Sequence, residues 1–128
     1  MLSIVLILLS TPLSICKLGP TSAIPPWAIR SSFFSISRTA DELSIVCPTE
    51  NVPQGTTQEK GWIAYKVQGT LDFSLTGILF SIAKPLADEK ISLFAISTYN
   101  TDYILVKETQ KEKSNQALQK AGFTVQMP

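Results

Sequence analysis

The chain has 128 residues, of which 45% are apolar and 16% charged, so it is long enough for one domain or two very small ones with a real core. Eleven Lys and Arg residues against ten Asp and Glu residues leave a net charge of +1, which argues against nucleic acid as a partner. Histidine is absent, and with it the commonest general base, the usual activator of a Ser or Cys nucleophile and the commonest metal ligand. Most hydrolase mechanisms are therefore disfavoured, and no motif for a cofactor or a metal is present.

The uncharged N-terminal segment, residues 1–16, begins like the apolar part of a signal peptide. However, no Lys or Arg precedes it, no small-residue cleavage pattern follows, and the continuous apolar run of residues 4–9 is shorter than the roughly 20 residues that span a bilayer. We predict two short buried strands here, at 3–9 and 14–18, joined by a turn at 10–12. This predicts a cytoplasmic protein without membrane contact; a secretion signal is the alternative.

The remainder of the first half is rich in turns and short strands. A proline-rich bend at 19–26 can open a short helix, since proline in a first helical turn loses no hydrogen bond. Residues 33–38 and 43–47 are β-rich runs on either side of a four-residue polar break, a pattern typical of a β-hairpin.

A polar segment at 48–60, which contains Pro and Gly and lacks apolar periodicity, predicts a linker. We therefore expect two domains, a β-rich module at 1–58 and a second module at 59–128. The two cysteines, Cys16 and Cys47, lie in apolar runs without the spacing of a metal motif. Two buried free thiols are the prediction, and a disulfide is the alternative.

The second half begins with a strand at 62–67, rich in β-branched and aromatic residues. Apolar residues then recur at helical spacing over 75–87 and predict an amphipathic helix. Either Asp72 or Ser74 is expected to supply the N-cap oxygen. Pro85 lies inside this pattern and predicts a kink or an early end of the helix.

Two further strands are predicted at 91–97 and 103–107, followed by a helix at 112–121 that ends at Gly122, and by a last strand at 124–127. The predicted order is βαββαβ. Such an order gives an α+β fold with an antiparallel sheet and both helices on one face.

Two loops of this fold converge, because the strand before the first helix and the strand after it are neighbours in the sheet. The first loop, 69–79, leads into a helix N-terminus that suits a carboxylate, and the second, 97–102, offers hydroxyl and amide groups with Asp102 as an anion for an ammonium or guanidinium group. The other interpretation is that these residues only cap a helix and form a tight turn. Gly77 lies inside the predicted helix, where glycine is unfavourable relative to alanine. Close approach of a ligand would explain a glycine there, and packing of the helix on the sheet would explain it equally well.

The segments LFAISTYNTDYILV and GTLDFSLTGIL, with the ending ALQKAGF, resemble the ACT domains of a subfamily that includes small bacterial tandem-ACT proteins and the animal cytosolic arginine sensor. The resemblance implies ferredoxin-like ACT modules, expected as a tandem pair packed side by side, with amino-acid effectors at module or subunit interfaces. Asp102 would be the principal anionic contact. The ligand-contacting residues that the resemblance implies are Asp72, Phe73, Ser74, Thr76, Gly77, Ile78, Ser97, Thr98, Tyr99, Asn100, Thr101 and Asp102.

These observations predict a non-catalytic, amino-acid-binding regulatory or sensor protein with no cofactor. A homodimer is expected to complete the site, because the resemblance covers only one tandem unit, and a regulatory protein partner is expected as well. The alternative is an ACT fold without a ligand that serves as a dimerisation or interaction module.

Overall fold

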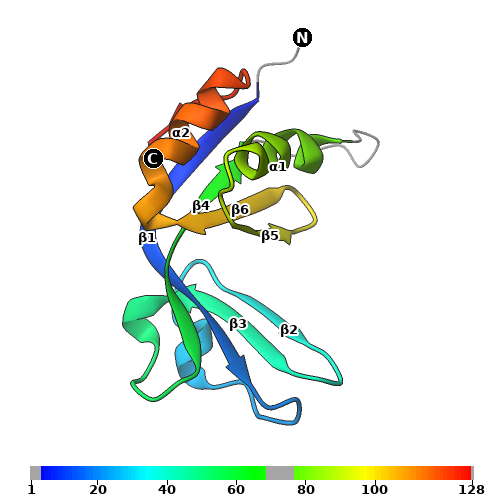
Figure 1. Ribbon diagram of the computed structural model, residues 1–128. Helices are drawn as coiled ribbons and strands as arrows, with labels where there is room; N and C mark the ends of the chain where they lie inside the picture. Colours follow the sequence, from blue (N-terminus) through cyan, green and yellow to red (C-terminus); the bar gives the residue numbers. More distant parts are fainter. Residues whose placement is uncertain (1–3, 69–76, 128) are drawn as a thin grey trace. The chain divides into compact units, whose positions relative to one another are not determined.

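The computed structural model describes residues 4–68 and 77–127 (Figure 1). The chain divides into two compact units, a larger one of Met1–Ser10 with Ile63–Pro128 and a smaller one of Thr11–Trp62. Two long strands, β1 (Val5–Leu18) and β4 (Gln58–Val67), contribute to both units.

The larger unit contains the βαββαβ order that the sequence predicts. After β4 come α1 (Ile78–Asp88), β5 (Leu93–Ser97), β6 (Asp102–Lys107), a short 3-10 turn (Glu108–Gln110), α2 (Lys111–Lys120) and β7 (Thr124–Gln126). Figure 1 shows α1 and α2 on one face of the strands. The predicted ferredoxin-like α+β fold class is thus confirmed.

The N-terminal strand β1 is an addition to that order. In the sheet it lies next to β4, and β7 pairs with it in parallel, with Val5 opposite Thr124. A backbone bond of 2.9 Å from the Gln68 N–H to the Val5 carbonyl joins the end of β4 to the start of β1. The sheet is therefore not wholly antiparallel, because its last strand aligns with β1.

The core of the larger unit lies between the sheet and the helices. Ile63, Tyr65 and Val67, at alternate positions of β4, are all buried in one cluster with Ile82 and Leu86 of α1. The Tyr65 hydroxyl donates a hydrogen bond to the Oδ1 atom of Asn115 on α2. Burial also raises the pKa of Tyr65, so this hydroxyl remains a donor at neutral pH.

Helix α1 begins later than predicted. Its N-cap is Gly77, where the sequence suggested Asp72 or Ser74, and no side chain caps it. Gly77 has φ +81°, a left-handed conformation, and a Cβ there would meet no described heavy atom within 4 Å. Gly77 is thus the N-cap and not a residue inside the helix, and its backbone conformation by itself favours glycine.

Pro85 does not end α1, which continues to Asp88. The helix closes with a Schellman motif, in which the Ile91 N–H donates to the Leu86 carbonyl and the Lys90 N–H to the Ala87 carbonyl, both at 2.9 Å. Lys90 has φ +60° there, a conformation that usually favours glycine.

Helix α2 ends with the same hydrogen bonds, but its left-handed residue is Gly122, at φ +102°. The predicted glycine exit is confirmed.

In the smaller unit, β1 pairs with β3 (Leu43–Pro48), and β3 pairs with β2 (Ser35–Arg38), both antiparallel. The predicted hairpin is confirmed, with the Thr39 N–H donating to the Glu42 carbonyl at 2.9 Å. Helical structure in Thr11–Trp62, a span that is fully described, is limited to two 3-10 turns, Pro26–Ile29 and Thr49–Asn51. A second ACT module at 1–58 stays a prediction.

The turn predicted at 10–12 is wrong, because β1 is continuous through it. Pro12 lies between the residues that pair with β7 and those that pair with β3, so its missing N–H interrupts neither of these ladders. The predicted linker is also too long, since β4 already begins at Gln58.

The two cysteines are free, as predicted, and both are buried in the core of the smaller unit. Burial, with the neighbouring Cys47 as a second cause, raises the pKa of the Cys16 thiol to about 11. Burial likewise raises the pKa of Cys47. Both thiols are therefore poor nucleophiles near neutral pH.

Candidate functional site

The predicted site residues that are described lie at the start of α1 and at the β5–β6 turn, which appear at the same end of the larger unit in Figure 1. Asp72, Phe73, Ser74 and Thr76 lie outside the described residues. Gly77 is the N-cap of α1, and Ile78, its first residue, is half-buried against the core.

Thr101 connects the β5–β6 turn to β4. Its side chain is only 5% exposed, and its hydroxyl donates a 2.7 Å hydrogen bond to the carbonyl of Val67, the last residue of β4. The predicted reason for the convergence of the two loops is wrong, because β6 and not β5 lies next to β4, and β5 is at the edge of the sheet. The turn is nevertheless held against the end of β4, the strand that leads into the first loop. An exposed threonine would contribute only to the turn itself. Because Thr101 is buried and hydrogen-bonded to β4, it fixes the position of the turn relative to that strand.

Other polar groups of the turn, from Ser97, Thr98, Thr101 and Asp102, are bonded to one another. The Thr98 N–H donates to the Thr101 carbonyl at 2.8 Å, and the Thr101 N–H donates to the Thr98 hydroxyl at 3.2 Å. Ser97 and Asp102 face each other as a cross-strand pair, and the Ser97 hydroxyl donates to the Asp102 carboxylate at 2.5 Å. The hydrogen bonds order Thr98, Thr101 and the carboxylate at the start of β6.

Asp102 is half-buried, and a carboxylate oriented by one hydroxyl retains further acceptor positions. Tyr99, at the tip of the turn, is 81% exposed, and Asn100 is also exposed. The turn can therefore offer an anion and an aromatic ring at one end of the sheet. Sequence reasoning missed the Val67 carbonyl as the partner of Thr101, and no side-chain pattern signals a backbone acceptor.

Within residues 4–68 and 77–127, no group of three His, Cys, Asp or Glu side chains is placed to hold a metal ion. No helix of that same part of the chain has the length and apolarity to cross a membrane.

The fold and the ordered polar turn define an α+β module of the ferredoxin-like class. The family model of the ACT domain matches residues 57–120, and a second model, of an N-terminal domain, matches residues 13–55. The chain belongs to the ACT domain family.

The chain is 32% identical to human CASTOR3P over 76% of its own length and 70% of that protein. It is 30% identical to the mouse cytosolic arginine sensor for mTORC1 subunit 1 over 65% of its length, but spans only 28% of that protein. The chain is also similar to the solved structure of Atu0741 from Agrobacterium tumefaciens, with 38% sequence identity and a TM-score of 0.94. This match covers all of the present chain and 96% of the Atu0741 chain. By name, the mouse relative is a sensor.

Proposed function

We propose that the protein is a non-catalytic regulatory or sensor protein that binds an amino acid at the β5–β6 end of its ACT domain. The observation that carries the proposal is the Thr101 hydrogen bond to Val67, since it fixes the turn in place before any ligand arrives. Asp102, oriented by Ser97, would hold a positively charged group of the ligand. The family and the sensor relative support an amino acid as the ligand class.

The proposal extends to a cytoplasmic location, a homodimer and a regulatory protein partner. It also includes the site residues before α1, Asp72, Phe73, Ser74 and Thr76, which would complete the ligand contacts from the loop that β4 leads into. Thr101 would act as a positioning residue, because its hydroxyl is already occupied.

A second candidate is an ACT fold without a ligand that serves as a dimerisation or interaction module. The hydrogen bonds of the turn favour this alternative, because the hydroxyls of Ser97, Thr98 and Thr101 all have intramolecular partners.

A thermal-shift screen of the protein against the twenty amino acids distinguishes the two candidates. A ligand at about a hundred times its dissociation constant adds about 2.7 kcal/mol and raises the midpoint by several degrees. We expect Asp102→Ala and Asp102→Asn to lose this response, the second while keeping an acceptor for Ser97. Glu108→Ala is the matched control, since Glu108 is an exposed carboxylate elsewhere in the same unit.

If no amino acid shifts the midpoint, the interaction module becomes the better reading. If an amino acid binds and both Asp102 variants respond like the wild type, the assignment of the carboxylate is wrong.

A further inference from the structure

An open groove of about 410 Å³ separates the second half of α1 from α2. It lies wholly in the larger unit and away from the β5–β6 turn. Its α2 wall is a single helical stripe at spacing i, i+3, i+4, i+7 and i+8, which borders the buried residues Ser114 and Leu118. The stripe consists of Lys113, Gln116, Ala117, Lys120 and Ala121.

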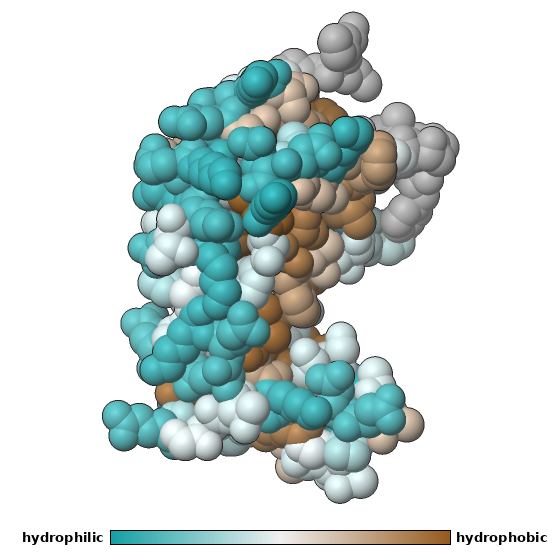
Figure 2. Space-filling view, in the orientation of Figure 1, coloured by the Kyte–Doolittle hydropathy of each residue, from teal (hydrophilic) through white to brown (hydrophobic). Residues whose placement is uncertain are grey.

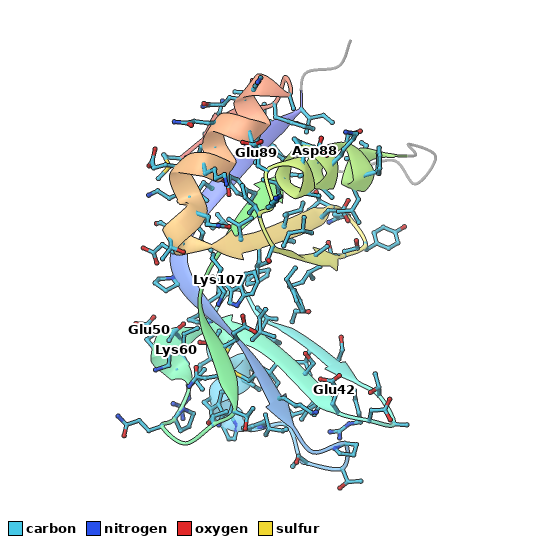
Figure 3. The ribbon with its side chains drawn as sticks, viewed as in Figure 1. Glu42, Glu50, Lys60, Asp88, Glu89 and Lys107 are labelled. Carbon is cyan, nitrogen blue, oxygen red and sulfur yellow. The ribbon has the colours of Figure 1, made fainter. Side chains whose placement is uncertain are left out.

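The two walls of the groove carry opposite charge. On α1 the charged residues are Asp88 and Glu89, which Figure 3 shows at the end of α1 next to α2, and on α2 they are Lys113 and Lys120. Figure 2 shows hydrophilic residues gathered over α2. Asp88 forms an ion pair of 2.7 Å with Lys84 of its own helix, and both side chains are more than half exposed. Such a pair is weak and exchanges its partner readily.

We propose that this groove is where a second copy of the chain docks, with α2 of each copy seated in the groove of the other. The inference rests on the proposed homodimer and names its surface. A two-fold axis brings the same surface of both copies together, so each contact occurs twice. The lysines of one α2 then meet Asp88 and Glu89 of the other copy, and the reverse contact follows by symmetry.

The shape of the stripe fits this arrangement. Ala117 lies between the two lysines, Ala121 follows Lys120, and Pro85 lies across the groove, so no long apolar side chain blocks the approach of a helix. Packed helices need axes about 8–10 Å apart, which short side chains at the contact allow. The chain thus presents both the groove and a helix of complementary shape and charge, which favours a second copy over an unrelated partner.

Sedimentation equilibrium with paired charge-reversal variants tests this surface. The acidic-wall variant is Asp88→Lys with Glu89→Lys, and the basic-wall variant is Lys113→Glu with Lys120→Glu. We expect the wild type to dimerise and each variant alone to dimerise more weakly by roughly tenfold or more, because like charges then face each other. An equimolar mixture of the two variants should regain dimers, since both symmetric contacts become attractive again in the heterodimer.

Matched controls make the same changes in formal charge outside the groove. They are Glu108→Lys with Glu112→Lys, and Lys17→Glu with Lys111→Glu, and we expect both to dimerise like the wild type. Circular dichroism checks that each variant folds. If the basic-wall variant does not fold, the variant Lys113→Gln with Lys120→Gln takes its place.

Three results would each overturn the proposal. These are a monomeric wild type, unchanged dimerisation of both charge-reversal variants, and a mixture of the two variants that stays monomeric. Because no amino acid is present in this experiment, its outcome is separate from that of the ligand screen.

Discussion

Replacing Thr101 by valine removes one hydroxyl from the buried contact between the β5–β6 turn and β4. Valine has nearly the same shape, so the change deletes the 2.7 Å hydrogen bond to the Val67 carbonyl with little effect on packing. Val67 is fully buried, and a buried acceptor without a donor costs about 1–3 kcal/mol. For a domain of this size, each kcal/mol corresponds to about 3–6 °C in the thermal midpoint.

Urea unfolding followed by circular dichroism measures this loss. Thr101→Ser is the matched control, because it keeps the hydroxyl and removes only a methyl group, so we expect it to lose about 1 kcal/mol or less. Since the turn would no longer be fixed, Thr101→Val should also weaken any ligand response more than Thr101→Ser does. If Thr101→Val is as stable as the wild type, or Thr101→Ser is the less stable of the two, the hydrogen bond does not anchor the turn.

Three further outcomes are expected. Tyr65→Phe should lower the free energy of unfolding by about 1–2 kcal/mol, because its hydroxyl is buried and bonded to Asn115; an unchanged urea midpoint would contradict this. Lys90→Gly should raise it by up to about 1 kcal/mol by relieving the left-handed residue that ends α1, whereas Lys90→Ala should leave it unchanged. Because the unfolded chain releases the Cys16 proton near pH 9.0 and the folded chain holds it to about pH 11, stability should fall as pH rises through that window; a Cys16→Ala variant should show a smaller fall, and an identical fall refutes the assignment.

Local patterns predicted most of the larger unit. The helical spacing that includes Ile82 and Leu86 identified the buried face of α1, and Gly122 marked the end of α2. The start of α1 was misjudged, because Asp72 and Ser74 are as suitable for an N-cap as any residue, while the cap that forms is a glycine chosen for its backbone conformation.

The candidate site was predicted in part. The turn at 97–102 follows from its residue types, and the hydrogen bonds among Thr98, Thr101, Ser97 and Asp102 show how it is ordered. That Thr101 faces inward could not be predicted, since its partner is a backbone carbonyl thirty-four residues earlier in the chain.

By itself, the sequence determined the apolar face of α1 and the βαββαβ order, because these depend on residues a few positions apart. Only the tertiary structure decided that β1 runs unbroken past Pro12 and takes a place beside β4, with β7 aligned along it. The physical reason is that any strand edge offers the same N–H and C=O groups, so the choice of partner is made by the packing of segments far apart in the chain.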